Sequence, residues 1–181
     1  EKAVDIGCEE IQVDYSRIST DSRMKNADFG IEAEEKSKID IITEFTKYAY
    51  EELDIYGAFV SADVYGAIID SEIDQEIVGQ DYVEMSKHLD YICPMIYPSH
   101  YADGSYEIEY PDLEPYRLIL ASLNKSKEVL SEIEDGEHVA IVRPWLQDFT
   151  APWISNYQKY GPKQIREQVE GVYDSGYEEW I

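Results

Sequence analysis

The stretch that decides the fold is Ile11–Thr20, IQVDYSRIST. It begins with alternating apolar and polar residues, the pattern of a short half-buried strand, and turns abruptly polar at Asp14. A carboxylate at this point stands where a core ends and a pocket can begin. Three later stretches share the format, apolar at the start and rich in polar or aromatic side chains at the end: Phe59–Gly66 (FVSADVYG), Ile92–Tyr101 (ICPMIYPSHY) and Ala140–Phe149 (AIVRPWLQDF).

Segments with the helical spacing of apolar residues separate these strands. A helix is expected to end within residues 3–10, and further helices are expected over residues 34–55, 82–89, 115–133 and 162–175. Strands are expected over 59–64, 91–97 and 139–145, with a fifth opening at 177–181, and loops over 21–33 and the carboxylate-rich 70–80. Such alternation predicts right-handed βαβ units and a parallel sheet, an α/β fold.

Two parallel architectures fit this order of elements, an open doubly wound sheet and part of a TIM (β/α)8 barrel. No glycine-rich phosphate-binding loop follows any strand, which weakens the dinucleotide-binding version of the open sheet. In a barrel the site lies at the C-terminal ends of the strands, and the polar residues fall there. The sequence therefore favours a partial barrel.

The chain has 181 residues, enough for one core, and no break in composition suggests a second domain. A whole barrel typically needs about 250 residues. We expect residues 1–181 to be one domain that is a fragment of a barrel. Five strands would leave two open edges, which either a missing N-terminal portion or a second copy in a homo-oligomer could cover. A targeting segment is expected to lie outside this chain, in a parent protein that is secreted or held at the cell envelope.

The net charge of −24 excludes some partners and leaves others. Nucleic acid and anionic membrane surfaces are disfavoured, because binding to phosphate needs clustered Lys and Arg. A neutral sugar or a cation remains compatible, no cofactor is implied, and no apolar run is long enough to span a membrane. Cys8 and Cys93 have no metal-site or redox spacing, so both are expected to be buried free thiols, with a disulfide as the alternative.

Several segments together resemble a family of bacterial glycoside-hydrolase-like domains first catalogued as a domain of unknown function. These segments are EIQVDYSRI, SADVYG, GQDY, YICPMIYPSHY, RPWLQDFTAPW, YGP and GYEEWI, and they cover nearly the whole chain in order. The resemblance implies a (β/α)8 barrel in which this chain runs from the end of the third helix to the eighth strand. Ser16 and Ser19 depart from the family, which commonly has a bulkier apolar residue and a proline there.

Cleavage of a glycosidic bond needs one carboxylic acid to protonate the leaving oxygen and a second carboxylate as nucleophile or base. The resemblance places Asp14 after the fourth strand, Asp63 after the fifth and Asp148 after the seventh. This layout is similar to amylase-type barrels, with a nucleophile on the fourth strand, an acid on the fifth and a helper after the seventh. Those enzymes have Glu at the fifth strand, where this chain has the shorter Asp63.

Other side chains at the same strand ends are candidates for holding the substrate. Arg17 and Arg143 are expected to pair with a carboxylate more than with substrate. Groups suited to a sugar ring or its hydroxyls are contributed by Tyr97, His100, Tyr101, Trp145 and Gln147, and Trp153 is a second indole that could stack on a sugar.

Three functions remain open on these residues. The first is hydrolysis of a polysaccharide through a carboxylate pair, and the second is a barrel that binds a cell-wall polysaccharide without cleaving it. The third, a divalent-metal hydrolase, needs clustered His and carboxylate ligands, and the sequence offers only His100 near the strand ends. The acidic run Asp70–Glu76 lacks the glycine and spacing of a calcium loop and is interpreted as a solvated face.

Overall fold

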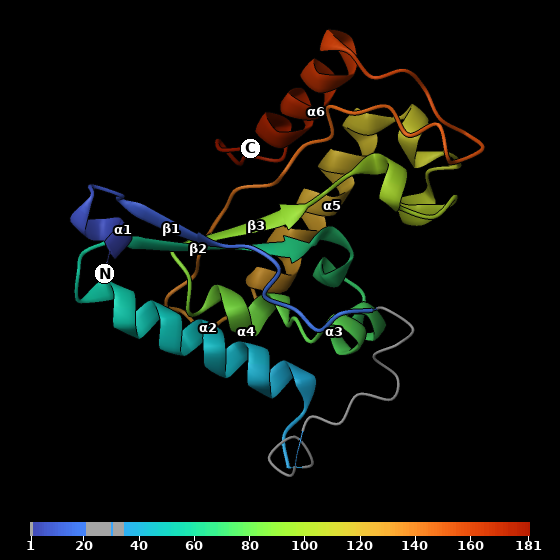
Figure 1. Ribbon diagram of the computed structural model, residues 1–181. Coiled ribbons are helices and arrows are strands. Elements are labelled where there is room, and N and C mark those ends of the chain that lie inside the picture. The colour runs from blue at the N-terminus through green and yellow to red at the C-terminus, as the bar shows by residue number, and fades with distance from the viewer. Residues whose placement is uncertain (1, 21–29, 31–34) are drawn as a thin grey trace. The chain divides into compact units, whose positions relative to one another are not determined.

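A computed structural model describes residues 2–20, 30 and 35–181 (Figure 1). Its strands are β1 (Glu10–Val13), β2 (Phe59–Tyr65), β3 (Tyr91–Met95) and β4 (Ile141–Val142). Its α-helices are α1 (Lys2–Asp5), α2 (Lys38–Asp54), α3 (Glu72–Val78), α4 (Tyr82–Ser86), α5 (Pro115–Leu130) and α6 (Pro162–Asp174). The loop expected over residues 21–33 lies, apart from Gly30, outside the described residues.

The four strands form one sheet in the order β1-β2-β3-β4. Strand β1 pairs with β2 in parallel, and the bridge that continues the sheet from Met95 to Trp145 is also parallel. The predicted α/β class with a parallel sheet is therefore confirmed. Strands that follow one another across the sheet in chain order are typical of a barrel, whereas a doubly wound sheet reverses direction at a switch point. The strand order thus favours the barrel.

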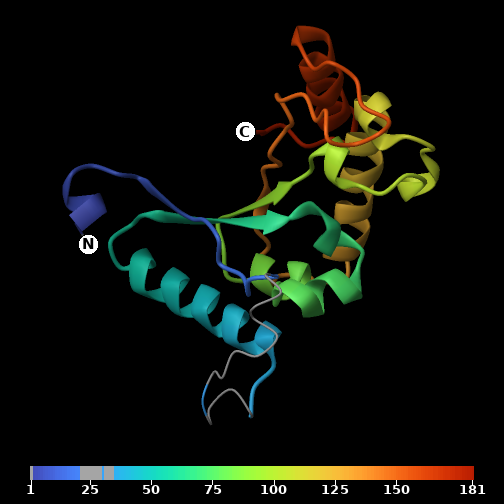
Figure 2. The same cartoon turned by 45° about the vertical axis from the view of Figure 1, so that its right-hand side comes forward.

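Contacts divide the chain into two compact units. The first comprises Glu1–Val64, Ser71–Ile92 and Ile133–Ile141, and the second comprises Tyr65–Asp70, Cys93–Glu132 and Val142–Ile181. In the first unit, α2 and α4 lie on the same side of the β1–β2 pair (Figures 1 and 2). Its buried apolar side chains come from both layers and include Ile42, Val60, Ala62, Tyr82, Met85, Leu89 and Ile92.

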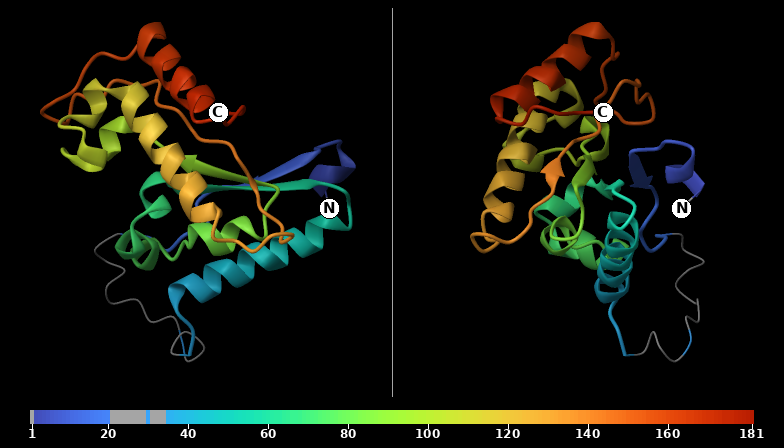
Figure 3. Two further views of the ribbon diagram at one scale, coloured as in Figure 1. Left: turned by 180° about the vertical axis from the view of Figure 1, so that it is seen from behind. Right: turned by 90° about the vertical axis from the view of Figure 1, so that its left-hand side faces the viewer.

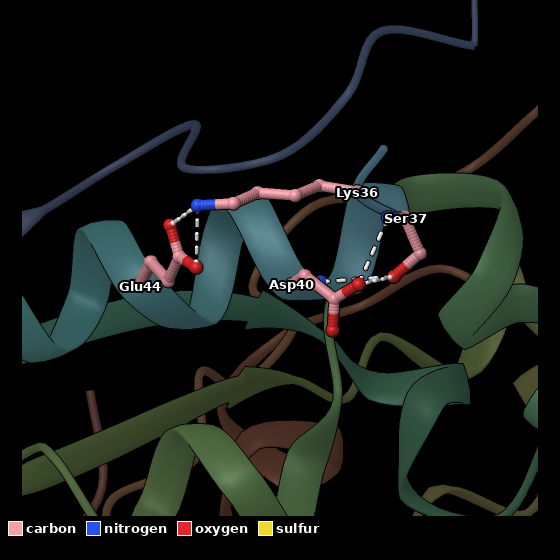
Figure 4. A network of polar contacts seen from close by, with 4 residues as sticks. All are labelled: Lys36, Ser37, Asp40 and Glu44. Atoms are coloured by element: carbon pink, nitrogen blue, oxygen red, sulfur yellow. Dashed lines mark hydrogen bonds and ion pairs between the residues drawn. The ribbon is translucent and has the colours of Figure 1, made fainter. Parts of the chain in front are cut away.

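Helix α2 begins at a capping box (Figure 4). The Ser37 hydroxyl accepts a hydrogen bond from the Asp40 backbone N–H at 3.1 Å, and the Asp40 carboxylate accepts one from the Ser37 backbone N–H at 2.9 Å. Lys36 adds an ion pair with Glu44 on the surface of the helix. These bonds satisfy the orphan N–H groups of the first turn, which explains why the helix begins at Lys38 instead of near residue 34.

The expectation of a loop over residues 70–80 is wrong, because α3 occupies most of it. The Ser71 hydroxyl caps its first turn by accepting from the Asp74 N–H at 3.2 Å. Gly79 ends the helix in the left-handed region, with φ 75°. The cap residues define both ends of this helix. Ile73 and Ile77 remain exposed, so the helix has no clear apolar face.

In the second unit, α5 packs against α6 (Figure 3). Gly171 makes this close approach possible, since a Cβ there would lie 2.9 Å from the Tyr116 carbonyl oxygen and 3.1 Å from the Ile119 Cβ. Fully buried apolar residues of this unit include Ile96, Ile108, Leu118, Ile119, Leu123 and Val172. None of the helices that the structure describes is long and apolar enough to cross a membrane.

Two expected strands are shorter than predicted. The fourth has only the two residues of β4, extended by the bridge at Trp145. Residues 177–181 form no strand, but Ile181 donates to the Pro144 carbonyl and accepts from the Leu146 N–H, both at 2.9 Å. These are the two hydrogen bonds of a parallel bridge, so the strand is represented by its last residue alone. Both cysteines are free as expected, but Cys8 is exposed instead of buried.

Candidate active site

The two leading carboxylates belong to neighbouring strands of the sheet. Strand β1 pairs with β2 so that Gln12 lies opposite Ser61 and Val13 opposite Ala62. Asp14 is the residue that follows β1, and Asp63 follows Ala62 within β2. Because alternate residues of a strand share a face, Asp63 lies on the face of β2 that carries Ser61. Both carboxylates therefore belong to the C-terminal part of the β1–β2 pair.

Asp63 is held in place by its neighbours. The residue is 7% exposed, and its Oδ1 accepts a hydrogen bond of 2.7 Å from the Gln12 side-chain amide. Its backbone carbonyl accepts a second bond, of 3.3 Å, from the Gln80 amide. These two bonds fix the position of the buried carboxylate.

Gln80 is a member of the site that the sequence analysis missed. It is 1% exposed, and its side-chain amide donates to the Ser16 carbonyl at 3.1 Å as well as to the Asp63 carbonyl. It therefore ties the turn that follows β1 to the end of β2. The segment GQDY contains Gln80 and contributed to the family resemblance. The sequence therefore contained a signal for this residue, but no role was predicted for it.

Asp14 lies on the exposed side of this arrangement. Its Oδ1 accepts from the Tyr15 N–H at 2.7 Å, and Tyr15 is in the left-handed region with φ 56°. A non-glycine residue there costs on the order of 1 kcal/mol and persists only when the surroundings enforce it. The surroundings do so here, because the Tyr15 carbonyl accepts from the Arg17 N–H at 2.8 Å and the Ile18 N–H donates to the Val78 carbonyl at 2.7 Å.

Arg17 stays beside the same turn. Its guanidinium carbon lies 5.2 Å from the centre of the Tyr15 ring, a cation–π distance, and its Nη1 donates to the Ile18 carbonyl at 3.3 Å. The guanidinium thus stabilises the strained turn that carries Asp14.

In the second unit the structure corrects the expectation that Gln147 binds substrate. Gln147 is 0% exposed. Its Oε1 accepts from the Ser99 N–H at 3.0 Å, and its Nε2 donates to Asp112 Oδ1 and to the Phe149 carbonyl, each at 3.0 Å. Since both donors and the acceptor are used internally, Gln147 joins the loops that follow β3 and β4.

Arg143 and Trp145 lie along the continuation of β4. Arg143 Nε donates to Glu179 Oε2 at 2.9 Å, so this guanidinium pairs with a carboxylate of the closing segment. The Trp145 backbone donates to the Pro94 carbonyl at 2.9 Å and accepts from the Ile96 N–H at 3.2 Å, which holds the half-buried indole at the end of the strand.

Three aromatic rings of the loops after β3 and β4 gather around Phe149. The centroid of Phe149 lies 5.5 Å from Tyr97, 6.0 Å from His100 and 6.0 Å from Trp153. Burial lowers the pKa of His100, so its imidazole is neutral at pH 7. Asp148, which precedes Phe149, is exposed.

Tyr101 is directed into the second unit. Its hydroxyl is buried, and burial raises the pKa of this phenol. A Cβ on Gly66 would lie 2.5 Å from the hydroxyl oxygen, so this ring fills the space beside Gly66. The structure therefore corrects the expectation that Tyr101 offers its hydroxyl to a sugar.

The end of the β1–β2 pair combines a buried carboxylate, Asp63, with an exposed one, Asp14. In residues 2–20, 30 and 35–181, no three His, Cys, Asp or Glu side chains are placed to hold a metal ion together.

Comparison with known proteins agrees with the sequence resemblance. The profile of the family described as "putative glycosyl hydrolase domain" matches residues 1–181. Among solved structures, the glycoside hydrolase domain of PgaB (BpsB) from Bordetella bronchiseptica is similar, with a TM-score of 0.49 and 17% sequence identity. The similarity covers 79% of this chain and 36% of that chain, so this chain spans about a third of that structure's length. No curated protein sequence matches the chain. Since the family profile extends over every residue, the chain belongs to the family of putative glycosyl hydrolase domains.

Proposed function

We propose that this chain carries the carboxylate pair of a glycoside hydrolase that acts on a polysaccharide. The observation that supports this most is the parallel pairing of β1 and β2, whose last pair, Val13 and Ala62, immediately precedes Asp14 and Asp63. Membership of a glycosyl hydrolase family supports the reaction class.

The two carboxylates have different environments, and hydrolysis needs two different roles. The acid donates a proton to the glycosidic oxygen as the bond from that oxygen to the anomeric carbon breaks. The other carboxylate either attacks the anomeric carbon or removes a proton from the attacking water. We assign the acid role to Asp63, which is buried and oriented by Gln12, and the nucleophile or base role to the exposed Asp14.

Asp148 is the third carboxylate of the proposal. It is exposed in the loop after β4, and we assign it contact with the substrate and no part in breaking the bond. Its charge and the overall charge of −24 favour a neutral polysaccharide over an anionic one. The edge strand β1 is where a further strand, from the parent protein or from a second copy, would pair.

The second candidate function is binding of a polysaccharide without cleavage. One observation favours it: Asp63 Oδ1 already accepts the Gln12 amide, so the carboxylate makes a structural hydrogen bond before any substrate arrives. A barrel that only binds would need no free proton donor at this position.

The experiment uses the protein that carries residues 1–181, its Asp14→Asn variant and a control variant, Asp5→Asn, on the exposed surface of α1. Each is incubated with a panel of neutral bacterial cell-wall and plant polysaccharides. New reducing ends are counted, and binding to each polymer is measured in parallel. The proposal expects cleavage by the parent and by Asp5→Asn, and loss of cleavage with retained binding in Asp14→Asn. Binding by all three without cleavage would favour the second candidate.

A further inference from the structure

The aromatic side chains around Phe149 include one that is largely exposed although hydrogen bonds hold its loop in place. We call Tyr97, His100, Phe149 and Trp153 the aromatic platform. Phe149 meets Tyr97 and His100 edge to face, at interplanar angles of 76° and 82°, whereas it meets Trp153 in a stacked arrangement at 21°. All four belong to the second unit. Two come from the loop after β3 and two from the loop after β4.

Trp153 is the exposed member of the platform. It is 66% exposed, although one side of its indole is directed at Phe149. Burial of a large apolar side chain stabilises a protein, and most of that stabilisation is absent here. The Phe149 ring lies nearly parallel to the indole at a centroid distance of 6.0 Å, so most of the indole stays accessible.

The loop that carries Trp153 is fixed on both sides. Before it, the Thr150 hydroxyl accepts from the Tyr160 N–H at 3.1 Å, and Ala151 is fully buried. After it, the Asn156 amide donates to Asp103 Oδ2 at 3.2 Å. The indole is therefore held ready for a ligand, and the cost of ordering a loop on binding is small.

The shape and charge of the platform select the ligand. A flat exposed indole matches the face of a pyranose ring, because the axial C–H groups of the sugar carry partial positive charge and the face of the indole is negative, while the sugar hydroxyls point outward. Carboxylate and imidazole groups of Asp148, Asp103 and His100 lie on the same two loops and can accept hydrogen bonds from hydroxyls. The same carboxylates repel uronic acids and phosphorylated sugars.

We propose that the aromatic platform is a binding subsite for a neutral pyranose unit of a polysaccharide, with Trp153 as the stacking residue. This inference rests on the proposed function for its substrate class and adds the residue that holds the sugar. It predicts binding of uncharged oligosaccharides and discrimination against acidic ones.

The test is calorimetric titration of the protein that carries this chain with cellohexaose, xylohexaose and chitohexaose, and with an oligogalacturonate as the anionic probe. The variants are Trp153→Ala, Trp153→Tyr and a matched control, Trp180→Ala, whose indole is 44% exposed in the same unit. We expect at least one neutral probe to bind, at least tenfold weaker binding in Trp153→Ala, partial recovery in Trp153→Tyr and no change in Trp180→Ala. Circular dichroism melts show that each variant is folded.

Three results would overturn the inference: no neutral probe binds, the oligogalacturonate binds as tightly as the neutral probes, or Trp153→Ala binds as tightly as the parent. Failure of the proposed function is a separate result. If binding depends on Trp153 but no reducing ends are released, the proposed hydrolysis is refuted and the sugar-binding role of the aromatic platform stands. If the polysaccharide is cleaved and Trp153→Ala leaves KM unchanged, the sugar-binding role of the platform is refuted and the proposed hydrolysis stands.

Discussion

Gln12 and Asp63 are joined across the β1–β2 pair by a hydrogen bond of 2.7 Å from the Gln12 amide to the Asp63 carboxylate. The two residues are 51 positions apart in the chain and lie on the same face of the sheet. The bond orients a buried carboxylate at the strand end where the chemistry is proposed. Substitution of Gln12 should therefore disturb the position of the Asp63 side chain while the Asp63 carboxylate itself remains.

We predict that Gln12→Ala lowers the free energy of unfolding by about 1.5–3 kcal/mol, the usual range for a lost hydrogen bond to a charged group. Gln12→Glu should be at least as damaging, because it places a carboxylate against the Asp63 carboxylate. Urea denaturation of both variants measures this. Equal stability of Gln12→Glu and the parent would show that the contact with Asp63 does not form.

We predict that Gln80→Ala costs about 2–4 kcal/mol, because it leaves the Ser16 and Asp63 carbonyls without this donor and opens a cavity in a buried position. Glu76→Ala, on the exposed surface of α3, is the control and should change the free energy of unfolding by less than about 0.5 kcal/mol. A Gln80→Ala protein as stable as the control would contradict the role of Gln80 as the tie between the two strand ends.

Gly66→Ala should destabilise the protein by about 1–3 kcal/mol, since the new Cβ would lie 2.5 Å from the Tyr101 hydroxyl and 2.6 Å from the Met95 carbonyl oxygen. Tyr101→Phe removes only the first of these clashes. In a double-mutant cycle we therefore expect partial recovery in the Gly66→Ala, Tyr101→Phe protein. Strict additivity of the two changes would mean that the Tyr101 hydroxyl does not pack against Gly66.

The pKa of His100 is lowered by burial in the folded protein, so the unfolded chain binds a proton at a higher pH than the folded one does. His100 therefore lowers stability as pH falls below its unfolded value of about 6.5, and the loss continues down to its folded pKa. Burial also lowers the pKa of His88, which titrates in the same window. The comparison of the parent with His100→Asn isolates His100. We expect a shallower pH dependence of the melting temperature between pH 5 and 7 in the variant, and identical slopes would contradict the burial of this imidazole.

Much of the fold could be predicted from the sequence because its signals are local. Alternation in IQVD and the mostly apolar segment FVSADV identify strands by residues near one another in the chain. Parallel pairing followed from the alternation with helices, and the carboxylates at the strand ends followed from where each apolar run stops. The capped helix α3 was missed because its signal is in Ser71 and Gly79 and not in an apolar face.

The rest of the site depends on contacts between distant segments, which one sequence does not reveal. Gln147 and Tyr101 follow strands at positions where exposed side chains also occur, yet Gln147 and the Tyr101 hydroxyl are buried. Gln80 and Asp112 are polar residues without a recognisable local signal, and only folding places them among partners 17 to 64 residues away. Burial of a polar side chain is decided by these partners and leaves little trace in local composition.

The most direct test of the account measures the release of reducing ends by the parent protein, Asp14→Asn, Asp63→Asn and the double variant, on a polysaccharide that the parent cleaves. Residues that act as one catalytic unit lose nearly all activity when either is removed, and little more when both are removed. The account predicts a large loss in each single variant and no further large loss in the double variant, with binding of the polymer retained. Independent, multiplying losses, or full activity in either single variant, would contradict the claim that Asp14 and Asp63 form the catalytic pair.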